Sequence, residues 1–183
     1  MLLPIRPLSS IGCGSAVGLD FDPIEEARRN WQERGWGDGQ AMVAATSITR
    51  AHQIVLAEVN AALAPFGITF SRFEVLALLY FARENSLPMG KIGDRLQVHP
   101  TSVTSLVNRL VDDDLVTRLA HPTDGRTTLV KLTNSGAVLA PNCAAALEQT
   151  SFGLAPMSRD QLDGLAATIT VLRRESGDWN PSE

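Results

Sequence analysis

The chain has 183 residues, of which 44% are hydrophobic and 20% charged, and its formal net charge at pH 7 is −4. This composition is typical of globular proteins. The acidic balance argues against a protein that coats nucleic acid through charge alone, but it is compatible with a regulator that has a local basic face. No apolar run is long enough for a membrane span, and the proline-interrupted start is not a secretory signal. We therefore expect a cytoplasmic protein with no membrane partner.

The start of the chain is predicted to form a tail and a short helix. Residues 1–20 mix Gly, Ser and Pro and are expected to be disordered. Asp22, Pro23 and Glu25 then supply an N-cap, a proline for the first helical position and a capping-box acid. The helix should run to about Arg34.

A longer helix is predicted from about residue 38 to residue 63, where an apolar stripe ends before Pro65 and Gly67. Trp31, on the first helix, and Trp36, between the two helices, are too large to be left exposed without a reason. We expect them to pack on the body of the protein or on a second subunit.

The next helix should begin with a capping box formed by Ser71 and Glu74, flanked by a hydrophobic staple of Phe70 and Val75. It is apolar on most faces as far as about Arg83, so we expect it to be buried.

Two further helices follow, separated by a turn at residues 97–99. In the first, from about 89 to 96, apolar or small residues share one face, and Gly93 would let the following helix cross closely. Pro100 suits the first position of the second helix. The buried face of that helix is predicted to consist of Val103, Leu106, Val107 and Leu110.

The opposite face of this second helix carries polar side chains, namely Thr101, Ser102, Thr104, Ser105, Asn108 and Arg109. Short hydroxyl side chains let a helix backbone approach the groove of DNA and can bond to base edges and phosphates. For an isolated helix, a solvated amphipathic face would be the simpler interpretation.

A predicted β-hairpin makes the DNA interpretation the stronger one. Its strands, 115–120 and 127–132, are β-prone runs joined by a turn rich in Pro and Gly. Arg118 and Arg126 lie on or beside the hairpin, and an arginine on a projecting loop can enter the minor groove. Asp124 could brace Arg126, although such a pair could also be an ordinary exposed ion pair.

Two more helices are predicted after the hairpin. Thr133 starts the first, which Pro141 should kink or interrupt. A capping box of Ser158 and Gln161 starts the last, which should end near Arg174. The first and last helices of the chain carry apolar stripes. The small unit formed by the helix pair and the hairpin, residues 68–133, cannot bury these stripes alone.

The residues suggest no catalytic or metal site. Cys13 and Cys143 are too few and too far apart for a disulfide framework or a zinc site. We expect a tail residue at Cys13 and a small buried residue at Cys143. Because no catalytic constellation is found, we expect no enzyme, no cofactor and no metal.

The hairpin and the helix before it resemble the MarR (multiple antibiotic resistance regulator) family of transcription factors. The wing signature of that family, Asp-x-Arg-x-x-x-Val-x-Leu-Thr followed by x-x-Gly, is met by Asp124, Arg126, Val130, Leu132, Thr133 and Gly136. The opening of the helix at 100–104 and the segment 115–118 are also similar. The sequence departs from the family at Gly125, where a second basic residue is common, and at the three aspartates 112–114.

The resemblance implies a mainly α fold with a small β-hairpin wing, in which N- and C-terminal helices form a dimerisation domain. The implied domains are 21–67 and 134–176 for dimerisation, 68–133 for DNA binding, and tails at 1–20 and 177–183. A homodimer would bind double-stranded DNA at a pseudo-palindromic operator as a repressor, and a small-molecule effector would release it.

Within that picture, the predicted DNA-binding residues take different roles. The helix begins at Pro100, and its hydroxyl-bearing residues would read bases, with Asn108 on the same face. Arg109 and Arg118 would hold phosphates, whereas Arg126, braced by Asp124, would enter the minor groove.

Two alternatives stay open. One is a winged helix that binds a partner protein, favoured by the aspartates 112–114 and by the weak charge of residues 71–133, where eight basic side chains face seven acidic ones. The other is a redox-sensing regulator that uses Cys13 or Cys143.

Overall fold

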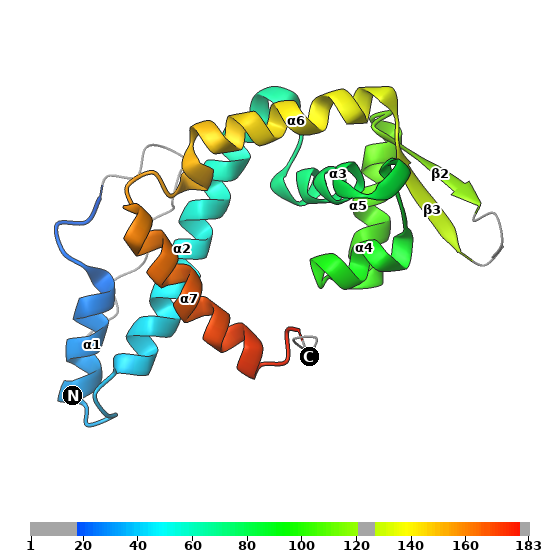
Figure 1. Cartoon of the computed structure of the whole chain (residues 1–183). Coiled ribbons are helices and arrows are strands. Elements are labelled where there is room, and N and C mark those ends of the chain that lie inside the picture. The colour runs from blue at the N-terminus through cyan, green and yellow to red at the C-terminus, as the bar shows by residue number, and fades with distance from the viewer. Residues whose placement is uncertain (1–17, 121–126, 180–183) are drawn as a thin grey trace, which may run out of the picture. The chain divides into compact units, whose positions relative to one another are not determined.

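The computed structural model describes residues 18–120 and 127–179 (Figure 1). The predicted tail lies mostly outside these residues, as do Cys13, Asp124 and Arg126. The chain divides into two compact units, residues 1–50 and 51–183. It is mainly helical with a small antiparallel sheet, which confirms the predicted fold class.

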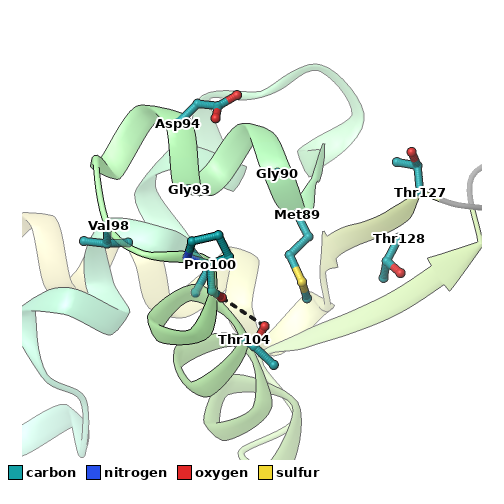
Figure 2. A pocket seen from close by; sticks show the side chains of 10 residues that line it. Met89, Gly90, Gly93, Asp94, Val98, Pro100, Thr104, Thr127 and Thr128 are labelled. Carbon is teal, nitrogen blue, oxygen red and sulfur yellow. Dashed lines mark hydrogen bonds between the residues drawn. The ribbon is translucent and has the colours of Figure 1, made fainter. Parts of the chain in front are cut away.

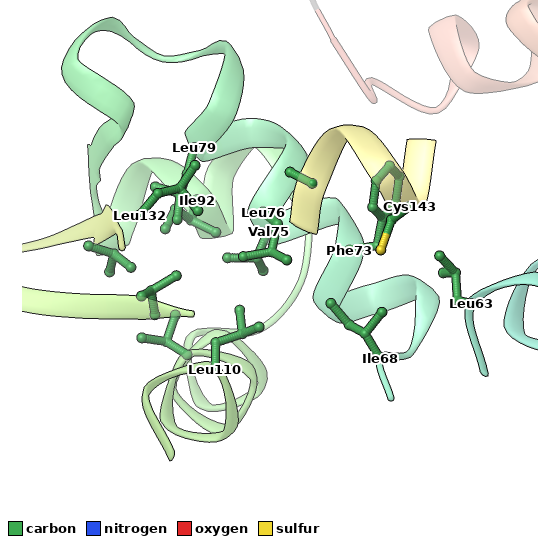
Figure 3. Close-up of a cluster of buried hydrophobic side chains, with 14 of the residues drawn as sticks. Leu63, Ile68, Phe73, Val75, Leu76, Leu79, Ile92, Leu110, Leu132 and Cys143 are labelled. Carbon is green, nitrogen blue, oxygen red and sulfur yellow. The ribbon is translucent and has the colours of Figure 1, made fainter. Parts of the chain in front are cut away.

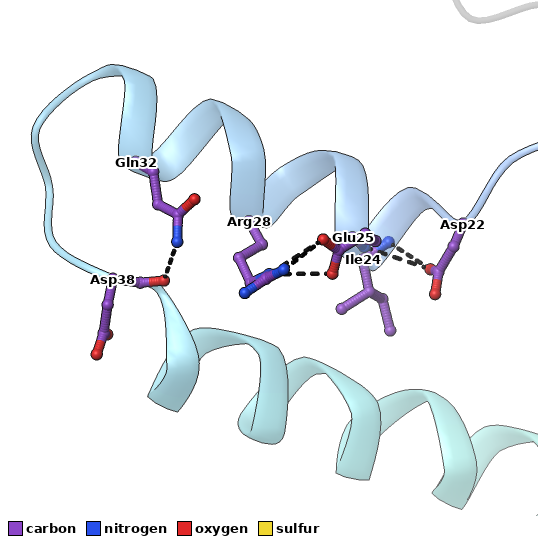
Figure 4. Close-up of polar contacts among 6 residues, drawn as sticks. All are labelled: Asp22, Ile24, Glu25, Arg28, Gln32 and Asp38. Carbon is purple, nitrogen blue, oxygen red and sulfur yellow. Dashed lines mark hydrogen bonds and ion pairs between the residues drawn. The ribbon is translucent and has the colours of Figure 1, made fainter.

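The first unit begins with α1 (Pro23–Glu33), whose start the sequence predicts correctly. The Asp22 carboxylate accepts a hydrogen bond of 2.9 Å from the Ile24 N–H and caps the helix (Figure 4). The predicted capping-box role of Glu25 is wrong. Its carboxylate instead accepts from the Arg28 guanidinium at 2.6 Å, because a charged partner one turn away outcompetes the backbone N–H. The same hydrogen bond lowers the pKa of the Glu25 carboxyl.

The two tryptophans of the first unit pack on each other rather than on the body of the protein. The Trp31 indole N–H donates to the Trp36 carbonyl at 2.8 Å, and the rings meet edge to face with centroids 5.1 Å apart. Trp36 is still 64% exposed. After this turn α2 (Gln40–Leu63) begins, and it continues into the second unit.

The second unit contains the other elements. In chain order these are α3 (Phe70–Phe81), β1 (Ser86–Pro88), α4 (Met89–Leu96), α5 (Pro100–Asp112), β2 (Val116–Ala120), β3 (Thr128–Leu132), α6 (Asn134–Gln149) and α7 (Arg159–Glu175), with short 3-10 turns η1 (Ala64–Phe66), η2 (Arg83–Asn85) and η3 (Ser151–Gly153). The predicted pair of helices and the two predicted strands of the wing are thus confirmed.

The core of this unit is built around α3. Val75, Leu76 and Leu79 of this helix are completely buried, and side chains of α4, α5 and the sheet close over them (Figure 3). Cys143 of α6 and Leu63 of α2 belong to the same cluster. The buried apolar side chains of α3 are therefore covered by helices and by the sheet.

The start of α3 differs from the prediction. The N-cap is Thr69, and the Ser71 capping box and its staple are wrong. The side chain of Asn60 in α2 supplies the cap instead, because its carbonyl oxygen accepts from the Phe70 N–H at 2.9 Å. A partner ten positions away, on another helix, therefore sets where α3 begins.

The sheet has a strand that the sequence analysis missed. The strand order is β1-β3-β2, so the predicted two-stranded hairpin is one part of a three-stranded sheet. Leu87 of β1 lies opposite Val130 of β3, and Arg118 of β2 lies opposite Val130 on the other side. With its short span and a terminal proline, Pro88, β1 is too brief to show an alternating pattern.

The helix α6 runs through Pro141 without a break, so the predicted interruption is wrong. Ala140, Cys143 and Leu147 are buried on the core side of this helix. Their packing holds the turns before and after the proline in one helix.

A tight junction joins the end of α5, the end of β3 and the start of α6. The Leu115 carbonyl accepts from the Thr133 N–H at 3.1 Å. The Thr133 hydroxyl donates to the Asp114 carbonyl at 2.7 Å and accepts from the Gly136 N–H at 3.0 Å. Asp114 adopts the left-handed conformation with φ of 55°, which is common for a residue that follows the end of a helix.

The junction leaves no room for a side chain at Gly136. A Cβ atom there would lie 2.1 Å from the Leu115 carbonyl oxygen. We expect Gly136→Ala to lower the free energy of unfolding by about 3 kcal/mol, since the backbone itself must move. Urea denaturation followed by circular dichroism measures this change.

The matched control is Gly164→Ala in α7, where a Cβ atom meets nothing within 4 Å. Because alanine favours the helix, this change should stabilise the protein by about 0.5–1 kcal/mol. Equal effects of the two substitutions would contradict the proposed role of Gly136.

Candidate nucleic-acid interface

The helix α5 is positioned from its first residue onward. Pro100 occupies its first position, and the His99 Nδ1 atom accepts from the Thr101 N–H at 3.3 Å as the N-cap contact. Val103 and Val107 are buried, and Leu110 is buried one turn later. These apolar contacts turn the opposite face of the helix to solvent.

That exposed face is the one that the sequence predicts to be polar. Every predicted polar position is exposed, namely Thr101, Ser102, Thr104, Ser105, Asn108 and Arg109, and so is Pro100 at the start of the helix. The Thr104 hydroxyl donates its proton to the Pro100 carbonyl at 3.0 Å (Figure 2). Thr104 therefore presents an acceptor oxygen to a ligand. Within residues 18–120 and 127–179, no side-chain hydrogen bond engages the hydroxyls of Thr101, Ser102 and Ser105.

The predicted close crossing of α4 and α5 is confirmed at Gly93. A Cβ atom at this position would lie 3.3 Å from the Cγ2 atom of Val103. The turn between the helices uses Gln97 in the left-handed conformation, with φ of 53°.

A side-chain contact ties the wing to α5. The Arg118 guanidinium, on β2, donates a hydrogen bond to the side-chain carbonyl of Asn108 on α5. The structure therefore brings together two of the predicted site residues from separate elements. Sequence reasoning placed both in the interface but missed their pairing, because no local pattern links a helix position with a strand position ten residues later.

The acidic end of α5 is also braced. Asp113, which caps the helix at its C-terminus, pairs with Arg72 of α3, and Arg72 also donates to the Gly67 carbonyl. The carboxylates at this end oppose the helix dipole, and the Arg72 guanidinium compensates for one of them. Asp124 and Arg126 of the wing tip lie outside the described residues.

Two pockets flank α5. One of about 450 Å³ lies between α4, the start of α5 and β3, with Met89, Gly93 and Thr104 among its walls (Figure 2). The other, of about 490 Å³, lies on the α3 side and is lined by Glu74 and Ser105. Partial burial of the carboxyl group raises the pKa of Glu74.

The rest of the described chain offers no competing chemistry. Cys143 is fully buried, and burial raises the pKa of its thiol, which disfavours the reactive thiolate. Within residues 18–120 and 127–179, no group of three or more His, Cys, Asp or Glu side chains is arranged to hold a metal ion. In the same residues no single helix meets the length and apolarity needed to cross a membrane, although one bent pair of helices does by length and composition only.

Comparison with known proteins identifies the family. A MarR family model matches residues 66–127. The Bacillus subtilis regulator MhqR is 32% identical over 89 residues, which is 49% of this chain and 60% of MhqR, so the match spans less than two thirds of that protein.

Solved structures extend the match. Sco5413 of Streptomyces coelicolor, a MarR family transcriptional regulator, is 42% identical with a TM-score of 0.71, over 76% of this chain and 97% of that chain. A mutant MarR from Escherichia coli, complexed with operator DNA, is 24% identical with a TM-score of 0.66, over 73% of this chain and 96% of that chain. The chain therefore belongs to the MarR family and has the winged helix-turn-helix fold of its regulators.

Proposed function

We propose that this protein is a homodimeric transcriptional repressor that reads a pseudo-palindromic DNA operator with α5 and its wing. The observation that carries the proposal is the exposed hydroxyl-rich face of α5, held outward by the buried face opposite and flanked by Arg118 of the wing. A mutant E. coli MarR of the same fold was solved in complex with operator DNA, which supports DNA as the partner.

The exposed face of α5 reads the major groove. Thr101, Ser102 and Ser105 donate to or accept from base edges, whereas Thr104 accepts only, because its proton is engaged by the Pro100 carbonyl. The chain enters the helix at Pro100, so the first turn approaches the bases most closely.

The arginines fix the position of the protein on the duplex. Arg109 and Arg118 hold phosphates, and the hydrogen bond to Asn108 holds the Arg118 guanidinium beside α5 before DNA arrives. Arg126 would enter the minor groove, a role that rests on the sequence alone. Because these arginines place positive charge locally, the proposal is compatible with the negative net charge of the whole chain.

The terminal helices support a dimer. Among the described residues, neither α1 nor α7 contains a buried side chain, and Leu165 and Leu172, on one face of α7, are 41% and 56% exposed. An apolar stripe of this kind needs a partner surface. Residues 21–67 and 134–176 would pair with a second copy and place two recognition helices about 34–36 Å apart, with 68–133 reading each half-site.

We also propose, from the family resemblance, that a small molecule releases the protein from DNA.

The alternative is that the same winged helix binds a partner protein. The affinity would then respond differently to salt, because only DNA binding releases condensed counterions. A role for Cys143 in peroxide sensing is disfavoured by its burial.

The first prediction concerns Arg126 and Arg118. In fluorescence anisotropy titrations with the DNA upstream of the protein's own gene, Arg126→Ala and Arg118→Ala should each weaken binding by about 1–3 kcal/mol, because each loses a contact to the duplex. Arg83→Ala, which removes an exposed positive charge outside α5 and the wing, is the matched control.

Salt decides between the two kinds of partner. The affinity of the unchanged protein should fall steeply between about 50 and 200 mM salt and should exceed its affinity for a scrambled duplex. Binding without sequence preference, even after selection from randomised duplexes, would refute the proposal.

The second prediction concerns Glu74. Because its pKa is raised in the folded protein, the folded state keeps a proton that the unfolded chain has already released, so stability falls as pH rises through the range above the ordinary Glu value. Glu74→Gln should remove this loss. Urea denaturation should then show the variant to be the more stable protein at pH 8, with the difference gone at pH 3.

The same substitution removes a negative charge beside the proposed DNA surface, so DNA binding at pH 8 should become about twofold tighter. Glu148→Gln, which removes an exposed carboxylate from the last turn of α6, serves as the control. A weaker DNA complex with Glu74→Gln would place its carboxylate among the groups that DNA needs.

The third prediction concerns assembly. Leu172→Glu places a charge in the exposed stripe of α7 and should shift the sedimenting species from two chains to one, because burying an unpaired carboxylate opposes association. Asp163→Glu, at an exposed position of the same helix that already bears a charge, should leave the mass unchanged. A single-chain mass for the unchanged protein would contradict the dimer.

A further inference from the structure

We infer that a strap positions the recognition helix. The strap is the contact between Gln97 and the residues Gly177, Asp178 and Trp179 after α7, which we call the C-terminal hook. This inference rests on the proposed function, since it assigns a device that sets the orientation of the helix proposed to read DNA.

Gln97 carries its side chain at a position where glycine is the usual residue. Its backbone has φ of 53°, in the left-handed region that ends α4, and a non-glycine residue there is strained. The side chain makes a specific contact in return. Its Nε2 atom donates a hydrogen bond of 2.6 Å to the Asp178 carbonyl.

The hook is shaped by the way in which α7 ends. Gly177 takes the left-handed conformation with φ of 72°, and its N–H donates to the Arg174 carbonyl at 3.0 Å. The Asp178 N–H then donates to the Arg173 carbonyl at 3.0 Å. These bonds satisfy the last carbonyls of the helix and turn the chain back on itself.

Arg173 holds the two residues of the hook beyond the glycine. Its Nε atom lies 2.5 Å from the Asp178 carboxylate, whose side chain is only 17% exposed. Its guanidinium carbon lies 5.1 Å from the centre of the Trp179 ring, in a cation–π arrangement. The Asp178 carbonyl is therefore held in a fixed direction for Gln97.

The contact joins the end of α7 to the turn directly before α5. Gln97 lies three positions before Pro100, the first residue of that helix. In the described chain the hook thus connects a helix proposed to dimerise with the turn that leads into the helix proposed to read DNA. Two recognition helices whose orientations are restrained before binding lose less freedom on DNA, so the intact strap favours the complex.

Gln97→Gly tests this role without weakening the fold. Glycine fits the left-handed conformation, so stability in urea should be preserved, while the bond to Asp178 is lost. We expect the operator affinity to fall about 3- to 10-fold, the range that one lost hydrogen bond produces. An unchanged affinity would overturn the inference, and a tighter complex would do so as well, because it would make the hook an inhibitory element.

A double-mutant cycle with Arg173→Ala sharpens the test. If both residues act through the hook, the double variant should bind DNA no more weakly than the weaker single variant. Arg174→Ala removes the same charge from the neighbouring position. The Arg174 side chain pairs with Glu175 at 3.4 Å, and Arg174 meets the hook only through its backbone carbonyl, which alanine keeps. Additive losses, or an equal loss with Arg174→Ala, would refute the strap.

A readout that needs no DNA separates failure of the strap from failure of the proposed function. In protein labelled with 5-fluorotryptophan, the ¹⁹F resonance of Trp179, assigned through Trp179→Phe, should shift on Gln97→Gly while those of Trp31 and Trp36 stay in place. If the unchanged protein does not bind DNA selectively, the proposed function fails, but this shift still tests the contact. An unmoved Trp179 resonance overturns the inference in every case.

Discussion

The contact between Gly136 and the Leu115 carbonyl is the constraint on which the reading head depends. At this point the recognition helix has just ended, the last strand of the wing has returned, and α6 begins. Thr133 holds the three segments through its backbone and its hydroxyl. Because a side chain at Gly136 would overlap the Leu115 carbonyl, the separation between the wing and α6 is set by backbone atoms alone. The Leu-Thr-x-x-Gly part of the family signature therefore has a structural explanation.

The recognition helix combines two demands that usually conflict. Its apolar face is buried as deeply as any part of the core, so its backbone is rigid. Its other face leaves hydroxyls and amides in solvent, where their bonding capacity is available. Rigid presentation of polar groups lowers the entropy lost on binding. Arg118, tied to Asn108 from the wing, adds a charge whose position is equally defined.

The sequence predicted best the elements whose signals are local. The bounds of α4 follow from periodicity, the start of α5 from Pro100, and the start of α7 from the Ser158–Gln161 capping box, which is present in the structure. The start of α3 and the strand β1 were missed because their determinants lie elsewhere in the chain. Asn60 supplies one cap from another helix, and β1 exists only because β3 offers it a hydrogen-bonding edge.

In the candidate site too, local features could be predicted from the sequence, whereas contacts between separate elements could not. Exposure of the polar face of α5 could be predicted because apolar residues recur at helical spacing along α5 and leave the polar residues on the opposite face. The pairing of Arg118 with Asn108, the bracing of Asp113 by Arg72 and the contact of Gln97 with Asp178 could not, since each joins residues from different elements. These three contacts are the ones that fix how the reading surface is held.

The cap that Asn60 places on Phe70 has a consequence for the cooperativity of the protein. The first turn of α3 is completed by a side chain of α2, and α3 lies at the centre of the core. Melting the end of α2 therefore leaves the Phe70 N–H unsatisfied at the start of the helix around which the core is built. A DNA-binding domain excised without α2 would lack a contact that completes its central helix, so the stability of this unit is shared among its helices rather than built helix by helix.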